Sequence, residues 1–246
     1  MKHVLAVLSV SFFLCSASVE DTSVSDSKAA TGPTFYFVRH GQTDWNVQEL
    51  RQGHADPALN ECGRQQARDL KARWAGLTFD ACFASDLQRA FVTADILTSR
   101  DLLVDDFVSA CSIEDITKDA RLRDRNYGVL EGASMEEYNN ASGEQRATIE
   151  SRDEFSDRVT EFLNEMQTSL SSLQSGNVLV VTHGGVMRIL LSIMFNIPVT
   201  LNDNGVVANT GFFKARFSGT EWVVKEMYGI TLPDMSELVS GSVAAR

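Results

Sequence analysis

An arginine, a histidine and a glycine directly follow a short apolar run near the start of the chain. Residues 35–38 have the composition of a buried strand, and Arg39, His40 and Gly41 come next. Ligands of open α/β sheets bind beyond the carboxyl ends of the strands, so these side chains are expected to face a crevice. Arginine suits phosphate, glycine permits close backbone approach, and histidine can be a nucleophile. A solvated Arg-His pair is the plainer alternative.

Two later apolar runs end in polar residues of the same kind. Residues 81–84 form a short predicted strand before Ser85, where we expect the start of a helix that carries Arg89. Residues 178–181 form the clearest buried strand and precede His183. The carboxyl ends of parallel strands converge on one crevice, and two arginines with two histidines there indicate phosphate chemistry. Taken singly, the arginine could lie on a helix surface and the histidine could be structural.

Helical patterns alternate with these strands. Asn60 can cap a helix, residues 153–173 have a long amphipathic pattern, and an apolar helix runs to Phe195. Residues 212–217 and 222–227 read as a late hairpin around a short turn. The alternation predicts an α/β domain with a mostly parallel sheet.

The composition limits the kinds of partner. The chain has 246 residues, enough for one domain of ordinary size, and a formal net charge of −11. Without a run of Lys or Arg, this charge argues against a nucleic-acid partner. An acidic protein that binds an anionic substrate must concentrate its positive charge locally, which directs attention to clustered arginines.

The N-terminus has the features of a secretory signal peptide. Lys2 and His3 precede an apolar stretch at 4–15 and small residues at 16–18. This stretch is shorter than the roughly 20 residues needed to span a bilayer, so stable membrane insertion is not expected. We predict a secreted or extracytoplasmic protein. Its expected segments are a signal peptide at 1–18, a disordered linker at 19–33, one domain at 34–232 and a flexible tail at 233–246.

Two patterns concern covalent modification. Removal of the signal peptide leaves Cys62, Cys82 and Cys111, an odd number that permits at most one internal disulfide. Small buried or semi-buried thiols are the favoured interpretation, and the spacing does not suggest zinc. Asn140-Ala141-Ser142 matches the N-glycosylation acceptor pattern and predicts an exposed segment.

Together the motifs resemble the histidine phosphatase superfamily, in its phosphoglycerate-mutase-like branch. The blocks are Arg39-His40-Gly41-Gln42-Thr43 with Trp45-Asn46, Ser85-Asp86-Leu87 with Arg89, and Thr182-His183-Gly184-Gly185. Residues 122–132 most resemble phosphatases of the fructose-2,6-bisphosphatase and TIGAR type. Further matching blocks lie at 51–53, 150–151, 158–159 and 209–211. The resemblance covers about residues 34–228.

The resemblance implies a three-layer α/β/α fold, with helices on both faces of the sheet, and phosphoryl transfer in two steps. His40 would attack phosphorus, and water would then cleave the phosphohistidine. Arg39, Arg89 and His183 would hold the phosphoryl oxygens. A hydrogen bond to the second ring nitrogen of His40 would fix its tautomer. The implied substrate-binding residues are Asn46, Gln52, Gly53, Tyr127 and Gly184. No metal or other cofactor is implied, since arginines provide the positive charge.

The proton donor is the main departure from the family pattern. The family acid is usually glutamate, and the matching residue here is Asp124, whose side chain is one methylene shorter. Glu131 is the alternative donor, although it could be structural. His54 lies near the 52–53 block and could touch substrate or be a solvated loop residue. The segment at 132–150 also differs from the family pattern. The choice of substrate is therefore the property that the resemblance predicts least well for this chain.

The predicted function is a secreted phosphomonoesterase for small phosphorylated metabolites, with sugar bisphosphates among the candidates. One alternative is a phosphotransferase of the phosphoglycerate mutase type, which would retain its product for re-phosphorylation. The other is a phosphate-binding relative without activity. Intact Arg39, His40, Arg89 and His183 argue against the latter. The sequence does not indicate an oligomeric state.

Overall fold

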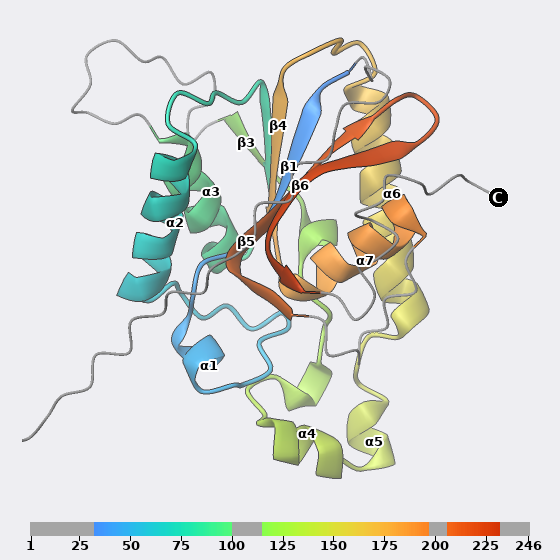
Figure 1. Cartoon of the computed structure of the whole chain (residues 1–246). Helices are drawn as coiled ribbons and strands as arrows, with labels where there is room; N and C mark the ends of the chain where they lie inside the picture. The colour runs from blue at the N-terminus through green and yellow to red at the C-terminus, as the bar shows by residue number, and fades with distance from the viewer. Residues whose placement is uncertain (1–31, 100–114, 197–205, 232–246) are drawn as a thin grey trace, which may run out of the picture.

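A single six-stranded sheet forms the centre of the computed structural model, which describes residues 32–99, 115–196 and 206–231 (Figure 1). The strands are β1 (Thr34–Arg39), β2 (Ala81–Ala84), β3 (Ile116–Lys118), β4 (Asn177–Thr182), β5 (Val206–Phe217) and β6 (Trp222–Thr231). Their order is β3-β2-β4-β1-β5-β6. The predicted signal peptide, all but the last two residues of the predicted linker, and the predicted tail lie outside the described residues.

The pairing brings three strand ends to one edge of the sheet. β1, β2, β3 and β4 are parallel, while β5 pairs antiparallel with β1 and with β6. Arg39 is paired with Thr182, and Ala84 with Val181, so β1, β2 and β4 end level with one another. The residues that follow these three strands therefore share one edge, as the sequence patterns predict.

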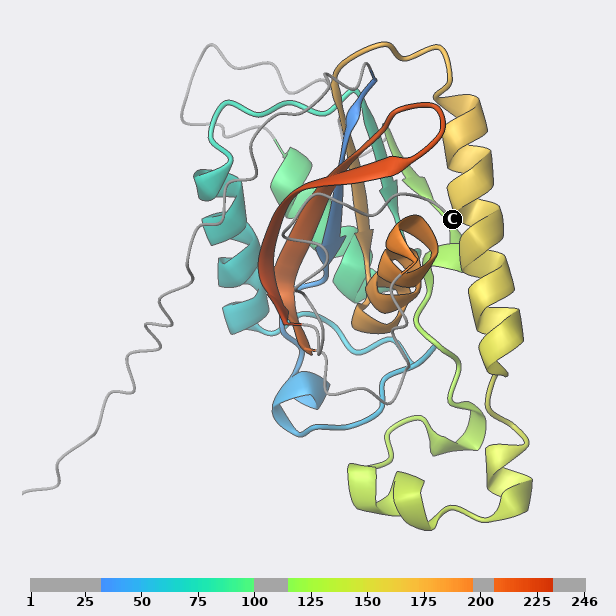
Figure 2. The same cartoon turned by 45° about the vertical axis from the view of Figure 1, so that its right-hand side comes forward.

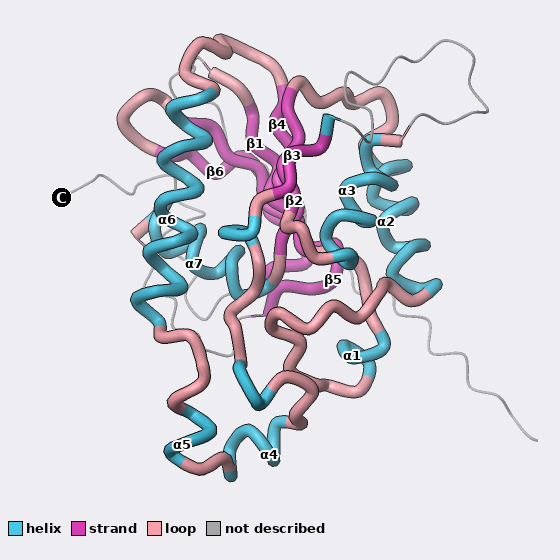
Figure 3. Tube along the Cα trace, turned by 180° about the vertical axis from the view of Figure 1, so that it is seen from behind, coloured by secondary structure: helices cyan, strands magenta, loops and turns pink. Residues whose placement is uncertain are grey.

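Helices cover both faces of the sheet. Helices α2 (Glu61–Arg73) and α3 (Gln88–Thr98) lie on one face, and α6 (Arg152–Ser169) and α7 (Gly184–Phe195) lie on the other (Figures 1 and 3). The short helices α1 (Asp44–Val47), α4 (Met135–Asn140) and α5 (Gly143–Arg146) lie beyond the carboxyl ends of the parallel strands (Figure 1). Single 3₁₀ turns, η2 (Ala120–Leu122) and η3 (Gly128–Leu130), precede α4. No helix in the described ranges has the length and apolarity of a membrane span.

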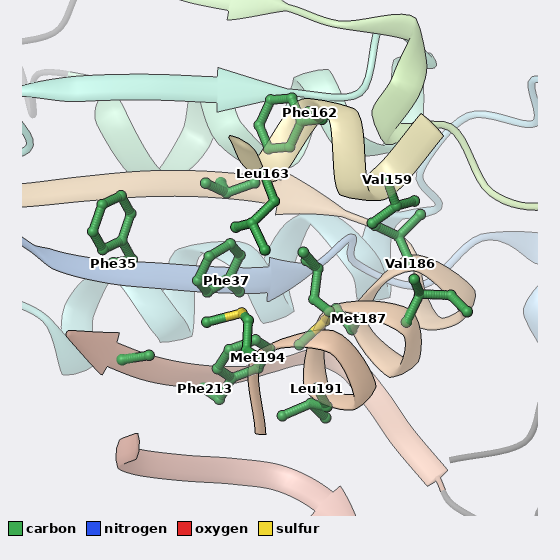
Figure 4. Packing of buried hydrophobic residues seen from close by; sticks show 14 of the residues in the cluster. Phe35, Phe37, Val159, Phe162, Leu163, Val186, Met187, Leu191, Met194 and Phe213 are labelled. Carbon is green, nitrogen blue, oxygen red and sulfur yellow. The ribbon is translucent and has the colours of Figure 1, made fainter. Parts of the chain in front are cut away.

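The sheet is buried on both faces, which explains the unbroken apolar runs of its central strands. Phe37 of β1 faces α6 and α7 and stacks on Phe213 of β5 with ring centroids 4.7 Å apart (Figure 4). The adjacent Tyr36 faces α2 and α3 and packs edge-on against Trp74, with centroids 5.2 Å apart. Successive side chains of β1 thus belong to different cores.

One predicted helix start is wrong. Helix α3 begins at Gln88 rather than at Ser85-Asp86. The two polar side chains bind distant partners instead of capping the helix. The Ser85 hydroxyl lies 2.9 Å from His183 Nε2, and the Asp86 carboxylate accepts from Arg123 Nε at 2.7 Å.

Other expected elements are found with different boundaries. Asn60 caps α2, as predicted, by accepting from Gly63 N at 2.9 Å. The late hairpin is present and extends from 206 to 231, whereas α6 ends at Ser169 instead of 173. Strand β3 was missed because only Ile116 of its three residues is buried, which leaves no alternating pattern.

The residues considered for covalent modification have different environments. Cys82 is buried in β2, whereas Cys62 is exposed in α2, which contradicts the expectation for that thiol. The two form no disulfide in the described part of the chain, and Cys111 lies outside it. Asn140 is exposed at the end of α4, as the acceptor pattern predicts.

Two glycines allow α2 to touch the loop that follows β1. A Cβ atom on Gly63 would lie 2.1 Å from Gln42 O, and one on Gly41 would lie 2.4 Å from Gly63 O. Gln66 of α2 also accepts a hydrogen bond from Gln42 N at 2.9 Å. The path of the loop therefore depends on direct backbone contact with the helix.

Replacement of Gly63 should disturb this contact. We expect Gly63→Ala to lower the free energy of unfolding by about 1–3 kcal/mol, because the new methyl group overlaps the backbone of Gln42. Urea unfolding measures the change. Gly143→Ala is the matched control, since its Cβ would meet no atom within 4 Å. Equal stability of the two variants would contradict the proposed packing constraint.

Candidate active site

A cleft of about 190 Å³ lies at the carboxyl edge of the sheet. Its lining includes His40 and the charged residues Arg39, Arg51, Asp124, Arg125 and Arg188. Its other lining residues are Asn46, Leu50, Gln52, Tyr127, Phe155, Gly184, Gly185 and Val207. Four guanidinium groups with one carboxylate make the cleft suited to an anion. Among the described residues, no group of three or more His, Cys, Asp or Glu could hold a metal ion.

His40 presents one defined ring nitrogen to the cleft. The imidazole is 2% exposed, and its Nδ1 lies 2.7 Å from Gly41 O. Because a carbonyl oxygen only accepts, Nδ1 carries the proton and Nε2 keeps its lone pair. Burial, followed by the charges of Arg39 and Arg89, holds the pKa of His40 well below its usual value. His40 is therefore a neutral imidazole with Nε2 available as a nucleophile.

Backbone contacts fix the position of His40. Its N–H donates to Thr182 O of β4 at 2.9 Å. Its carbonyl accepts from Asn209 Nδ2 at 3.1 Å and from Thr210 N at 3.3 Å. Asn209 also donates to Asn46 Oδ1 at 3.2 Å, so one side chain links the histidine to a residue of the cleft wall. Residues 209–211, which belong to β5, thus help to hold His40 in position.

Arg39 carries a donor that the described protein atoms leave unsatisfied. Its Nη1 donates to Val207 O, whereas its buried Nε has no hydrogen-bond partner among the described residues. Burial lowers the pKa of Arg39 to about 10, so the side chain stays charged at neutral pH. The position that a Cβ on Gly184 would occupy is 3.5 Å from this Nε. A bound anion would satisfy the donor.

The N-terminus of α7 adds backbone donors to the same wall. Gly184 and Gly185 line the cleft and begin this 12-residue helix. The first N–H groups of a helix lack intrahelical acceptors, and the helix dipole favours negative charge there. The cleft therefore combines Arg39 with a helix N-terminus beside the His40 imidazole.

Arg89 and His183 lie outside the cleft lining, although the resemblance implies that they hold phosphoryl oxygens. Arg89 is fully buried and donates to Ala55 O at 2.7 Å, to Gly53 O at 2.8 Å and to His183 Nδ1 at 3.2 Å. His183 Nε2 therefore carries a proton and donates to Ser85 Oγ at 2.9 Å. Both imidazole nitrogens of this histidine are thus engaged.

These two residues form a layer next to His40. The His40 and His183 ring centroids lie 5.1 Å apart with the rings inclined by 60°. Burial and the charge of Arg89 hold the pKa of His183 well below its usual value. The predicted residue Gly53, with a φ of 52°, accepts from Arg89 and also lies outside the lining. In this structure the layer sets the electrostatic environment of His40.

Asp124 shares the cleft with His40. Its Oδ1 accepts from Arg125 N at 3.0 Å. A Cβ on Gly185 would lie 2.3 Å from that oxygen, so the carboxylate packs on the first turn of α7 where only glycine fits without a shift. The structure therefore brings the predicted nucleophile and the predicted proton donor into one cleft.

An arginine of α6 holds the backbone that carries Asp124. Arg158 Nη1 donates to the carbonyls of Arg121 and Arg123, both at 2.7 Å, and Nη2 donates to Asp124 O at 2.8 Å. The same guanidinium binds Glu150 at 2.6 and 2.9 Å. One guanidinium group thus holds three backbone carbonyls of the segment that supplies the short acid.

Glu131, the alternative donor, has a different place. Its Oε1 accepts from His54 N at 2.6 Å, and a Cβ on Gly53 would lie 2.5 Å from the same oxygen. Neither Glu131 nor His54 lines the cleft, and His54 Nδ1 lies 3.3 Å from Asn126 Nδ2. Glu131 therefore holds the loop at 53–54, which favours Asp124 as the donor.

Of the predicted substrate-binding residues, Asn46, Gln52, Tyr127 and Gly184 line the cleft. Burial, followed by the charge of Asp124, raises the pKa of Tyr127, so its hydroxyl stays protonated. Three further arginines line the cleft: Arg51 and Arg125, which lie in the matching blocks but were assigned no role from the sequence, and Arg188, which was missed. Arg188 could have been found, because it is the only charged residue of the apolar α7 and follows Gly184 by one helical turn.

The two buried imidazoles make stability depend on pH. We expect the free energy of unfolding to decrease as the pH falls below about 6.5, approaching about 1.4 kcal/mol per pH unit for each histidine. The folded pKa values of His40 and His183 are depressed, so only the unfolded chain takes up these protons. Urea unfolding between about pH 5 and pH 8 measures the slope. An unchanged slope in a His40→Asn, His183→Asn double variant would contradict this expectation.

The fold and the site agree with known proteins. The model of the histidine phosphatase superfamily (branch 1) matches residues 35–229. A probable phosphoglycerate mutase, GpmB, of Salmonella choleraesuis is 30% identical over 215 residues, which cover 82% of this chain and 94% of that protein. This confirms the resemblance to the superfamily and to phosphoglycerate-mutase-like proteins.

Solved structures share the architecture as well. YhfR of Bacillus stearothermophilus is 25% identical with a TM-score of 0.65, covering 80% of this chain and 96% of that one. A mycobacterial glucosyl-3-phosphoglycerate phosphatase, solved with VO3, is 25% identical with a TM-score of 0.62, covering 80% and 98%. The α/β fold with helices on both faces of the sheet is thereby confirmed. The chain belongs to the histidine phosphatase superfamily.

Proposed function

We propose that the protein is a phosphomonoesterase that hydrolyses small phosphorylated metabolites through a phosphohistidine on His40. The observation that carries this proposal is the 2.7 Å hydrogen bond from His40 Nδ1 to Gly41 O, which leaves Nε2 unprotonated in an arginine-lined cleft. Asp124 in the same cleft provides the acid that an ester leaving group requires.

In the first step the Nε2 lone pair of His40 forms a bond to phosphorus, and the bond from phosphorus to the ester oxygen breaks. Asp124 gives its proton to the departing oxygen, which leaves as an alcohol. Arg39, Arg188 and the N-terminus of α7 stabilise the charge on the phosphoryl oxygens. The neutral state of His40 is essential here, because an imidazolium has no lone pair to donate.

In the second step water attacks the phosphohistidine. The Asp124 carboxylate takes a proton from the water as the new bond to phosphorus forms, and the bond from phosphorus to nitrogen breaks. Inorganic phosphate leaves, and His40 returns to the neutral form that the Gly41 carbonyl holds. Asp124 is protonated again and ready for another ester.

The proposed substrates are small metabolites, including sugar bisphosphates. Support comes from the likeness of residues 51–53 and 122–132 to phosphatases of the fructose-2,6-bisphosphatase and TIGAR type. The N-terminal pattern at 1–18 supports secretion or another extracytoplasmic location. The net charge of −11 supports action without a nucleic-acid partner, and the short apolar stretch at 4–15 argues against stable membrane insertion.

A mutase is the second candidate, because the 30%-identical relative is a probable phosphoglycerate mutase. A mutase returns the phosphoryl group from histidine to a retained product, whereas a phosphatase gives it to water. The 51–53 and 122–132 blocks favour water as the acceptor. With 3-phosphoglycerate as substrate, hydrolysis gives inorganic phosphate and a mutase gives 2-phosphoglycerate. Phosphorus NMR separates these products.

Removal of the nucleophile tests the covalent step. We expect His40→Ala to abolish turnover of an aryl phosphate, and rapid-quench labelling of the native protein to place phosphate on His40. The reason is that no other group of the cleft offers an unprotonated ring nitrogen. His54→Ala is the control, since His54 lies outside the cleft lining and should keep both label and turnover. Label on a serine or an aspartate would overturn the mechanism.

The loss of rate on substitution of the acid should depend on the leaving group of the substrate. We expect Asp124→Asn to slow alkyl phosphate hydrolysis by about 10²- to 10⁴-fold, or about 3–5 kcal/mol of barrier. Aryl phosphates with good leaving groups should lose much less, because their oxygen departs without a proton.

Steady-state kinetics on both substrate types measures the difference, with Glu131→Gln as the matched control. Equal losses on both substrates in Asp124→Asn would assign Asp124 a binding or structural part. A leaving-group-dependent loss confined to Glu131→Gln would transfer the acid role to that residue.

A further inference from the structure

One arginine of the cleft packs against two aromatic side chains. The Arg51 guanidinium carbon lies 5.3 Å from the Tyr127 ring centroid and 4.7 Å from that of Tyr138. The two rings are 5.8 Å apart and inclined by 86°. Arg51 Nη2 also donates to Met135 Sδ at 3.1 Å. Aromatic faces attract a cation without using its hydrogen-bond donors, so this arrangement orients the side chain and leaves donors for a ligand.

The backbone of Arg51 is fixed to the same segment. Arg51 N donates to Ala133 O at 2.9 Å, and Gly132 N donates to Arg51 O at 2.7 Å. Tyr138, whose ring contacts the Arg51 guanidinium, lies in α4, which begins shortly after Ala133. Residues 127–138 therefore hold both the main chain and the guanidinium group of Arg51.

The α4–α5 segment that carries Tyr138 is itself well braced. It stands apart from the sheet and its covering helices (Figure 2). Ser134 caps α4 through a reciprocal pair of hydrogen bonds with Glu137. Arg146 donates to Tyr138 O at 2.8 Å and places its guanidinium carbon 5.2 Å from the Tyr138 ring. Tyr138 is thus fixed through its carbonyl and its ring, although it does not line the cleft.

Arg51 is available for a group other than the reacting phosphoryl. Arg39 and the N-terminus of α7 lie at the ends of β1 and β4, whereas Arg51 belongs to the segment between α1 and α2. Within the described residues, no carboxylate forms an ion pair with Arg51. A cation that lines an anion-binding cleft and has no carboxylate partner there is suited to bind a second negative group of the ligand.

We infer that Tyr138 is a positioning residue, which holds the Arg51 guanidinium for a second anionic group of the substrate. This inference rests on the proposed function and narrows the substrates to phosphomonoesters that also carry a carboxylate or another phosphate. The selectivity then resides in α4, outside the cleft lining, and acts through Arg51.

Two ligands that differ in one anionic group provide the test. 3-Phosphoglycerate carries a carboxylate where glycerol 3-phosphate has a hydroxymethyl group, and both are alkyl phosphates. Their inhibition constants are measured against turnover of an aryl phosphate by the whole chain. We expect Tyr138→Ala to raise the inhibition constant of 3-phosphoglycerate about five- to tenfold and that of glycerol 3-phosphate less than about twofold. The kcat for the aryl phosphate should not change.

Two further variants separate positioning from general loosening of the segment. Tyr138→Phe keeps an aromatic face and should restore the discrimination. Ser134→Ala removes the α4 cap without removing the ring and should weaken both ligands equally or not at all. An equal loss for both ligands in Tyr138→Ala, or the same loss in Tyr138→Phe, would overturn the inference.

The assay also distinguishes this inference from the proposed function. A native protein that does not turn over aryl phosphate would contradict the proposed phosphatase activity, and calorimetric titration with the two ligands would still report the role of Tyr138. A protein that turns over aryl phosphate but gives no Tyr138-dependent difference would contradict the positioning role alone.

Discussion

The hydrogen bond between His40 Nδ1 and the Gly41 carbonyl decides which ring nitrogen a substrate meets. At 2.7 Å, and with the ring almost fully buried, it assigns the proton to Nδ1 and the lone pair to Nε2. The Gly41 turn that supplies this carbonyl lies directly against the backbone of Gly63 in α2. The residue that fixes the tautomer of the nucleophile is thus itself packed against a helix.

A second constraint is the burial of positive charge beside that imidazole. Arg89 is fully buried, and its donors are satisfied by two loop carbonyls and by His183 rather than by a carboxylate. Burial of the imidazole, followed by the charges of Arg39 and Arg89, holds the pKa of His40 well below its usual value, so the ring stays neutral. The charge also favours an incoming anion. The same arrangement therefore keeps the nucleophile unprotonated and draws the substrate toward it.

The sequence predicted those parts of the site that follow from local pattern. Apolar runs located three strand ends, and the residues after them placed Arg39 and His40 at the shared edge. The sequence also placed Arg89 and His183 at this edge, but their partners could not be predicted, because each hydrogen bond joins residues far apart in the chain. The start of α3 was mispredicted for the same reason, since the Ser85 hydroxyl accepts a hydrogen bond from the distant His183 and does not cap the helix. Arg188, by contrast, could have been predicted, because it is the one charged residue of the apolar helix α7.

The tautomer of His40 at neutral pH tests the central claim most directly. Nitrogen NMR of protein labelled with ¹⁵N-histidine separates a protonated ring nitrogen from one that carries a lone pair, and a His40→Asn variant identifies the signals among the four histidines. We predict a neutral His40 ring with the proton on Nδ1 and none on Nε2, maintained well below pH 6.5. An imidazolium at neutral pH, or a ring protonated only on Nε2, would contradict it.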